Sequence, residues 1–590
     1  MSNMDLLQAT ARLESDKRLP ALFDIIRDYG DTPCSVWLKG EEELSLSYAE
    51  MARRSDDYAA YLKENTPEGG WIGVAVDTCP NWPTLFWGVI RSGHNVLLLD
   101  ASAADSMIQG LMEEAGCRVI ISRKPRGLSG DIRQIDYRSV ADAPRTIGFT
   151  PVWGEYVAMC TSGTTGRSRI FAYSGEAVCE QALTSLYIFR TNPRVIRRDN
   201  VGRRALAFLP FHHVLGFMAN VVWVSFLGVT NVYLPDRTPN SIMNVCRHFP
   251  PNLLIVVPLV GNNLVKSLER SVKKEKAVKR LLFRAFFGLS LAVQSVAPTF
   301  GLRLAQKHLF AGIDSRVLGT QVDALILGGS HTPTETLRTL NALGYYTING
   351  YGMTETAVNG FETSMSLAKR LNGSVGATLG SAEYRIAGEN GAKTGELQVR
   401  GPGIHSGRVV KGEILPPDTL DGGWFPTGDI AQMYDSGRVF IKGRLKDVII
   451  NESGENVYPD DLEDAFSALS GVEQICVVGF PRNKRDQNED VTLVLNVGEN
   501  YSDRNYLNSL AGKVAAINAR LPLYAQLDRA LVTPMSLPLV SGIKVKRIEL
   551  KRLYEEKELV YRELDLRAQS AGAEVAAASE KARTKSAMQD

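Results

Sequence analysis

The 590-residue sequence predicts an α/β fold. We expect a large N-terminal domain of two doubly wound βα subdomains plus a small β-rich subdomain, followed by a small mobile α+β C-terminal domain. Two observations support this. Short apolar runs alternate with helical segments over 71–122 and again over 205–349, which is typical of parallel sheets with crossover helices. From about residue 385 onward, short β segments separated by Gly and Pro replace this alternation.

The first βα region follows an entry segment that ends near residue 66. Ser47 suits the N-cap of a helix over 47–62, and Glu50, three residues later, would complete a capping box. The other elements expected here are helices over 19–29, 81–92 and 107–115, and strands over 34–38, 71–76, 95–99 and 118–122.

The second βα region contains a long uncharged stretch, from His213 to Pro235, about as long as a membrane span. Gly216, Asn220 and Gly228 interrupt it, so we favour a buried helix over 214–227 and a buried strand over a transmembrane segment. The strands expected in this region are 205–209, 232–234, 253–258, 324–327 and 346–349.

Residues 266–287 combine eight Lys and Arg residues with Leu and Phe, which predicts a basic amphipathic helical segment. Two interpretations stay open. The segment is either a solvated helix packed on the body of the protein, or a peripheral contact with an anionic membrane surface.

We place the N-terminal domain at 1–442 and the small C-terminal domain at 443–566. The Ala- and charge-rich residues 567–590 read as a disordered tail, because they offer no core to bury. Within the small domain we expect helices over 459–468 and 505–516 and strands over 474–479, 491–496 and 530–532.

Composition excludes several classes of function. The formal net charge of +2 gives no general field for recruiting nucleic acid. The seven cysteines stand singly, without a CxxC pair, which argues against zinc and disulfides and favours a reducing cytosol. The first residues lack an apolar run, so we expect no secretory signal and a cytoplasmic protein, with contact to the inner face of a membrane left open.

The stretch over 159–170 has the chemistry of a phosphate-binding loop. Small hydroxyl residues and glycines follow a predicted strand, so backbone N–H groups have room to converge on one anion. Arg169 adds full positive charge. The loop residues in question are Thr161, Ser162, Gly163, Thr164, Thr165 and Gly166.

A second glycine-rich motif covers 349–356 and carries three different chemical groups. Tyr351 offers a flat ring for stacking, Thr354 a hydroxyl and Glu355 a carboxylate that suits Mg²⁺ beside phosphate oxygens. Farther along, Asp429 sits on a Thr-Gly-Asp turn and can accept from both ribose hydroxyls. Additional motifs lie at 209–216, 443–447, 454–463 and 538–547.

The order and spacing of these motifs resemble the adenylate-forming superfamily of acyl- and aryl-CoA synthetases, luciferases and adenylation domains. The similarity covers about residues 20–560. The helical stretch before 322–330 and the sequence SGENVYP at 453–459 are most similar to fatty acyl-CoA synthetases. The resemblance implies that a carboxylate attacks the α-phosphate of ATP to give acyl-AMP and pyrophosphate, after which the thiol of CoA displaces AMP.

The resemblance also implies roles for individual residues. Residues 161–169 would hold the β- and γ-phosphates, Thr354 the α-phosphate and Glu355 the Mg²⁺. The remaining implied roles are adenine stacking for Tyr351, ribose binding for Asp429 and Arg444, nucleotide contact for Gly329 and Gly352, carboxylate and α-phosphate bridging for Lys544, a place between acyl site and thiol route for His213, and the hinge for Lys446.

The sequence departs from the family pattern twice. Ser168-Arg169-Ile170 replaces the usual Pro-Lys-Gly, which keeps the charge but removes a flexible glycine. Ile543 separates Gly542 from Lys544 where the family has Ser-Gly-Lys. Three interpretations therefore stay open: a CoA ligase, most similar to medium- or long-chain fatty acyl-CoA synthetases; a ligase that stops at acyl-AMP or loads a carrier protein; and a non-catalytic nucleotide-binding relative.

Overall fold

The structure is a computed structural model of the chain. It describes residues 4–161, 169–312, 321–388, 391–451, 455–467, 469–481, 489–540 and 544–566. The chain forms two compact units. The first consists of residues 1–387, 397–427 and 433–440, and the second of residues 388–396, 428–432 and 441–590.

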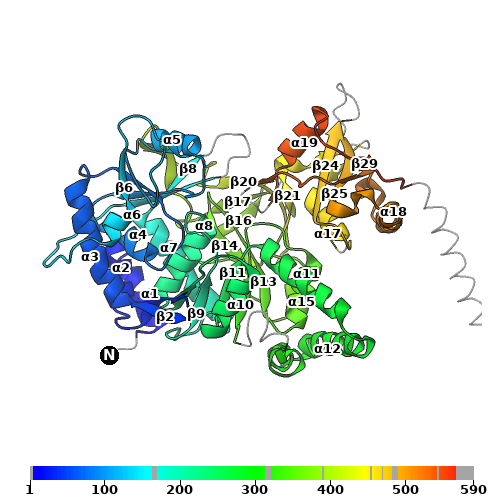
Figure 1. Cartoon of the computed structure of the whole chain (residues 1–590), viewed down its shortest axis with the longest axis horizontal. Helices are drawn as coiled ribbons and strands as arrows, with labels where there is room; N and C mark the ends of the chain where they lie inside the picture. The colour runs from blue at the N-terminus through cyan, green and yellow to red at the C-terminus, as the bar shows by residue number, and fades with distance from the viewer. Residues whose placement is uncertain are drawn as a thin grey trace, which may run out of the picture. The chain divides into compact units, whose positions relative to one another are not determined.

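Two large mixed sheets form the frame of the first unit (Figure 1). The nine-stranded sheet has the order β15-β14-β13-β12-β11-β9-β10-β1-β2, and its strands from β13 to β1 run parallel. Its strands are β1 (Pro33–Lys39), β2 (Glu42–Ser47), β9 (Arg204–Ala207), β10 (Thr230–Tyr233), β11 (Leu253–Val256), β12 (Ala324–Leu327), β13 (Thr347–Met353), β14 (Ala357–Phe361) and β15 (Ala377–Thr378).

The eight-stranded sheet has the order β19-β18-β8-β7-β4-β3-β5-β6, parallel from β7 to β6. Its strands are β3 (Trp71–Ala75), β4 (Asn95–Leu98), β5 (Val119–Ser122), β6 (Arg133–Asp136), β7 (Tyr156–Cys160), β8 (Ile170–Ser174), β18 (Gly407–Val410) and β19 (Glu413–Leu415). The helices of this unit include α1 (Leu6–Ser15), α2 (Leu19–Arg27), α3 (Tyr48–Asn65), α4 (Trp82–Arg91), α5 (Asp105–Glu114), α6 (Tyr137–Ala141), α7 (Gly175–Thr191), α10 (Pro239–His248), α11 (Pro258–Lys274), α12 (Ala277–Val296), α13 (Pro298–Leu304), the π-helix η2 (Ala305–Leu309), α15 (Thr334–Ala342) and α16 (Leu367–Leu371).

A smaller sheet has the order β16-β17-β20-β21, with β16 antiparallel to β17. Its strands are β16 (Glu383–Ile386), β17 (Thr394–Arg400), β20 (Phe425–Met433) and β21 (Val439–Arg444). The C-terminal part of the chain is α+β, with a four-stranded sheet of order β24-β25-β26-β29. Its elements are the 3-10 helix η3 (Leu445–Asp447), β22 (Ile449–Ile450), β23 (Asn456–Val457), α17 (Pro459–Phe466), β24 (Gln474–Pro481), β25 (Glu489–Asn496), η4 (Gly498–Ser502), α18 (Arg504–Asn518), η5 (Leu523–Ala525), β26 (Arg529–Thr533), β27 (Leu539–Val540), β28 (Lys544–Val545), α19 (Arg547–Glu555) and β29 (Arg562–Glu563). The predicted fold class is confirmed.

One predicted cap forms only in part. The side chain of Ser47 accepts from the N–H of Glu50, as expected for the N-cap of α3. The carboxylate of Glu50 does not complete the capping box. It binds Arg53 and Arg54 one helical turn later, because these charged donors compete with a single backbone N–H.

The uncharged stretch after His213 is a buried helix, as predicted, but an irregular one. It consists of α8 (Val214–Gly216), the π-helix η1 (Phe217–Trp223) and α9 (Val224–Phe226). Its buried Asn220 donates from Nδ2 to the side chain of Asn231 on β10 over 2.9 Å, which gives this amide nitrogen a partner inside the core. Among the described residues, no helix has both the length and the apolar character needed to cross a membrane.

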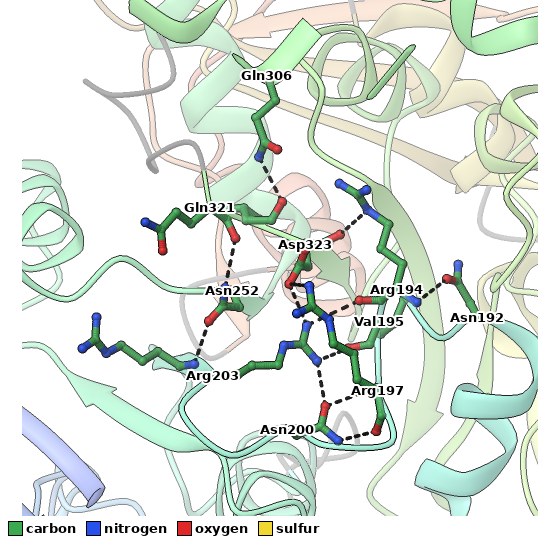
Figure 2. A network of polar contacts seen from close by, with 12 residues as sticks. Asn192, Arg194, Val195, Arg197, Asn200, Arg203, Asn252, Gln306, Gln321 and Asp323 are labelled. Carbon is green, nitrogen blue, oxygen red and sulfur yellow. Dashed lines mark hydrogen bonds and ion pairs between the residues drawn. The ribbon is translucent and has the colours of Figure 1, made fainter. Parts of the chain in front are cut away.

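A polar network fixes the amino ends of the parallel strands in the nine-stranded sheet (Figure 2). Asp323, just before β12, binds Arg197 at 2.8 Å and Arg203, just before β9, at 3.0 Å. Asn252, just before β11, accepts from the backbone N–H of Arg204 at 2.9 Å. With the amino ends held this way, the loops at the opposite, carboxyl ends are left for binding, where ligands of α/β sheets usually lie.

Candidate active site

The β13–β14 hairpin forms the centre of the site, and its geometry requires the glycines of the 349–356 motif. A Cβ atom on Gly350 would lie 2.2 Å from the ring of Phe361. One on Gly352 would lie 2.1 Å from the carbonyl oxygen of Ala357. No other residue type fits at either position, so the glycines allow the two strands to approach closely.

Two side chains from distant segments hold the turn of this hairpin. The hydroxyl of Tyr173, on β8, donates to the carbonyl oxygen of Thr354 over 2.6 Å. The backbone N–H of His405 donates to the carbonyl oxygen of Glu355 over 3.1 Å, and His405 Nδ1 lies 2.6 Å from the same oxygen. The Thr354 and Glu355 side chains are half-buried at the edge of the site.

The ring of His405 is buried between two aromatic side chains. Its ring lies between Phe171 and Phe425, at centroid distances of 4.9 and 5.1 Å. Burial lowers the pKa of His405, partly offset by the contact with the Glu355 carbonyl. The imidazole is therefore neutral at pH 7 and carries its proton on Nδ1, the nitrogen that faces the carbonyl.

Asn349 and Tyr351 lie two residues apart on β13 and so project from the same face of the strand. Tyr351 is nearly buried and meets the edge of Tyr384 at 6.4 Å. The Oδ1 atom of Asn349 is buried and has no hydrogen-bond partner among the described residues. A buried carbonyl oxygen in this state is an acceptor ready for a ligand donor.

The base of the predicted phosphate loop continues the β7–β8 ladder. The N–H of Thr161 donates to the carbonyl of Arg169 over 2.9 Å, and the N–H of Arg169 donates to Thr161 Oγ1 over 3.1 Å. Five predicted phosphate ligands lie outside the described residues: Ser162, Gly163, Thr164, Thr165 and Gly166.

A histidine pair lies where the carboxyl ends of the two large sheets meet. His212 and His213, in the loop after β9, have ring centroids 4.2 Å apart. Asp100, two residues after β4, lies 3.8 Å from His212 Nε2. Burial lowers the pKa of both imidazoles, to about 4 for His212, and Asp100 offsets only part of this effect. Both rings are therefore neutral at pH 7.

Gly329 follows β12 at the same edge of the nine-stranded sheet. Its φ of +91° is a conformation that residues other than glycine rarely adopt. The preceding Gly328 lies close to the hairpin, since a Cβ there would come within 3.5 Å of the Gly350 carbonyl oxygen.

In the second unit, Asp429 and Arg444 form an ion pair of 2.7 Å between Oδ1 and Nε. Asp429 is buried, whereas Arg444 is about one-third exposed. The turn that presents Asp429 needs Gly428, whose φ is +69°, and the N–H of Gly428 donates to Glu396 over 2.9 Å. The predicted ribose ligands are thus adjacent to each other.

Lys544, with a predicted role in the first reaction step, and Lys446, the predicted hinge, belong to segments that one arginine joins. Lys446 is exposed in η3, and Lys544 begins β28, which pairs with β27. Arg547, three residues after Lys544, binds Asp447 at 3.1 Å, next to Lys446, and also Asp460 and Glu463 at 2.6 Å each. The Arg547 pKa is raised, because these carboxylates outweigh the cost of burial.

Comparison with known proteins decides the family. The family described as AMP-binding enzyme matches residues 22–407, about two-thirds of the chain. The chain belongs to the AMP-binding enzymes. Within this adenylate-forming superfamily, it is an acid–thiol ligase of the AMP-forming type.

Individual members resemble this AMP-binding enzyme at low identity. The long-chain-fatty-acid–CoA ligase FadD13 of Mycobacterium tuberculosis is 23% identical over 486 residues, covering 76% of this chain and 83% of that protein. A chloroplastic long-chain-fatty-acid–[acyl-carrier-protein] ligase of Arabidopsis thaliana, AEE15, is 26% identical over 380 residues, covering 55% and 49%. The structure of Bacillus subtilis O-succinylbenzoate coenzyme A synthetase with ATP and magnesium has a TM-score of 0.68 at 17% identity, covering 90% and 98%.

The sequence analysis did not identify four residues of the candidate site of this AMP-binding enzyme: Asp100, Tyr173, Asn349 and His405. For Asp100 the sequence held a usable signal, since an acidic residue directly follows the apolar strand 95–99. Asn349 stood inside the analysed motif, but its unpaired Oδ1 depends on the folded environment. Tyr173 and His405 reach the hairpin turn from 181 and 50 residues away, which no local pattern indicates.

Proposed function

We propose that this AMP-binding enzyme activates a medium- or long-chain fatty acid with ATP and transfers the acyl group to the thiol of CoA. The observation that carries the proposal is the β13–β14 turn, where Tyr173 and His405 fix the backbone under Thr354 and Glu355. A preorganised hydroxyl and carboxylate suit a reaction in which charge builds up on a five-coordinate phosphorus. The fatty-acid preference rests on the similarity to FadD13 and on the sequence SGENVYP at 453–459.

The adenosine contacts follow from the residues on β13 and from the acidic turn. Tyr351 stacks on adenine, and the unpaired Oδ1 of Asn349 accepts a hydrogen bond from the exocyclic amine. Asp429 and Arg444 bind the ribose hydroxyls, with the carboxylate accepting and the guanidinium donating. Gly329 and Gly352 leave room for the nucleotide because neither carries a side chain.

The phosphate contacts divide between two segments. Thr161–Arg169 grips the leaving pyrophosphate, and Arg169 supplies forked donors where the family has lysine. Thr354 donates to the α-phosphate. Glu355 is the Mg²⁺ ligand, and a single half-buried carboxylate fits an ion that takes most of its ligands from phosphates and water. Mg²⁺ supplies charge neutralisation for the departing pyrophosphate.

The acyl carboxylate approaches past the histidine pair. Because burial keeps His212 and His213 neutral, they present ring nitrogens without trapping the carboxylate in an ion pair. Lys544 bridges the carboxylate and α-phosphate oxygens in the first step. The small domain over 443–566 then turns about Lys446, which removes Lys544 and opens the thiol route. The scattered, free cysteines support a cytoplasmic setting for this chemistry.

A carrier protein is the alternative acyl acceptor, because AEE15 is named for one. One assay separates the candidates: pyrophosphate and AMP release with a panel of carboxylic acids, each run alone, with CoA and with a phosphopantetheinylated carrier protein. We expect release that peaks with fatty acids and AMP formation that CoA stimulates. Stimulation by the carrier alone would replace CoA as the acceptor. No release with any acid at saturating Mg·ATP would leave a non-catalytic protein and overturn the proposal.

A further inference from the structure

Helix α12 has two apolar faces, of which the described residues of the protein cover one and leave the other exposed. On the inner face, Phe283, Phe286 and Phe287 pack against the core beneath the nine-stranded sheet. Ser290 and Gln294 fasten this face to α15 through the carbonyls of Ala342 and Asn341, at 2.6 and 2.8 Å. The helix is thus fixed in its rotation, so its other face is held outward. Figure 1 shows α12 below α15 in the large unit.

The outer face is a continuous apolar stripe. Val278, Leu281 and Leu282 are exposed to 69, 69 and 49%, and Leu289 and Val296 to 47 and 87%. At about 100° per residue, these five side chains fall within an arc of roughly 100° around the helix axis. Ala285 and Ala292 lie in the same arc and are also exposed. The stripe extends over 18 intervals, or about 27 Å of helix.

Cations border this stripe. Six Lys or Arg residues but only one acidic residue occur over 273–284, which gives this short stretch a local charge of +5 in a chain whose net charge is +2. The single acid, Glu275, already pairs with Lys279 at 2.9 Å. Lys279 and Arg284 lie on opposite sides of the apolar arc, and both are exposed. The positions 285–300 carry no charged residue at all.

We propose that the outer face of α12 binds the surface of an anionic lipid bilayer. An apolar stripe bordered by cations matches a helix that lies in the interface, with its apolar side among the acyl chains and its cations at lipid phosphates. The helix lies on the bilayer and does not cross it, in accord with the absence of a spanning helix among the described residues. If the proposed function holds, this surface brings the enzyme to membrane-dissolved fatty acid. The binding itself does not depend on that function.

The test is flotation of the full-length protein with phosphatidylcholine vesicles, with and without phosphatidylglycerol, at low and high salt. We expect binding to the anionic vesicles that weakens with salt. The double variant Leu281→Gln/Leu289→Gln should bind at least about tenfold less, since two apolar anchors are lost. The matched control is Ile147→Gln, which alters an apolar residue that is 91% exposed outside this helix and should bind like the wild type.

Three results would overturn the proposal. The first is equally negligible binding to both vesicle types at low salt, and the second is unchanged vesicle binding by the double variant. The third is a wild-type protein that is dimeric and a double variant that is monomeric, with neither protein binding vesicles. The last result would assign the stripe to contact between two copies. Pyrophosphate release with a short, water-soluble acid should be the same for all variants. This readout shows that the double variant is folded, and it tests the proposed function separately.

Discussion

The Nδ1 atom of His405 lies 2.6 Å from the carbonyl oxygen of Glu355, and the backbone N–H of His405 donates to the same oxygen over 3.1 Å. A residue 50 positions away thereby holds the backbone of the proposed Mg²⁺ ligand twice. His405 makes no proposed contact with substrate, so we regard it as a positioning residue.

Replacing His405 by Phe keeps an aromatic ring between Phe171 and Phe425 and removes the side-chain donor. We expect kcat/KM for Mg·ATP to fall about tenfold, equivalent to ~1.4 kcal/mol for one lost hydrogen bond. The Mg²⁺ concentration needed for half-maximal activity should rise. His405→Asn is the control, because its amide can place a donor where Nδ1 stands. Equal losses in both variants, without a change in Mg²⁺ dependence, would indicate packing alone.

Asn349 is predicted to read the exocyclic amine of adenine. The wild type should discriminate between ATP and purine riboside triphosphate, which lacks this amine, because the buried Oδ1 would stay unpaired with the analogue. Asn349→Leu removes the acceptor, so the KM for ATP should rise by about tenfold. The KM values for ATP and for purine riboside triphosphate should then become similar. Discrimination that survives in Asn349→Leu would assign this acceptor to structure instead.

The His212 imidazole should make stability depend on pH. Its pKa is about 4 in the folded chain, because it is buried next to His213, against an ordinary value of 6.5. The unfolded chain therefore binds the proton first, and stability is lost as pH falls from 6.5 to 4, by about 3 kcal/mol over the whole interval. His212→Gln cannot be protonated and should lose less stability over this interval. Thermal unfolding of both proteins between pH 7 and 4 measures the difference, and parallel curves would contradict the assignment.

Lys544→Ala should separate the two proposed half-reactions. Fatty-acid-dependent ATP–pyrophosphate exchange should fall at least about 100-fold, since the cation proposed to bind the reacting phosphate is lost. Conversion of supplied acyl-AMP to acyl-CoA should persist, because in the proposed mechanism Lys544 leaves the site before that step. Lys546→Ala, two residues away, is the matched control. Unchanged exchange in Lys544→Ala would show that Ile543 has shifted this lysine out of its role.

The pattern of apolar residues predicted the fold well, because the burial of an apolar run depends mostly on the residues within that run. Apolar runs became strands with nearly the expected bounds, as β12 illustrates at 324–327. The predicted capping box was wrong because two local partners competed for the Glu50 carboxylate. It binds arginine side chains and not the N–H at the helix N-terminus. The regular helix expected over 214–227 contains a π-helical segment, since apolar periodicity does not distinguish the two.

The proposed site was harder to predict because it is assembled from distant segments. The sequence motifs predicted site roles for Thr354 and Glu355, and the structure places both residues on one turn. The hydroxyl of Tyr173 and the ring of His405 that hold this turn depend on how the sheets pack. The same holds for the pairing of Asp100 with His212, which joins the loops of two separate sheets.

The carboxylate of Asp323 offers a route to a temperature-sensitive form of this enzyme. It holds Arg203, a buried guanidinium whose pKa burial lowers to about 10, and it binds Arg197 as well. In Asp323→Asn these cations would face each other without their counter-charge, at the sheet edge opposite the β13–β14 turn. Cells that carry Asp323→Asn would contain the folded enzyme at low growth temperature and lose it at high temperature, with the catalytic groups unchanged. A shift in temperature would then remove the enzyme at a chosen time and reveal its cellular role.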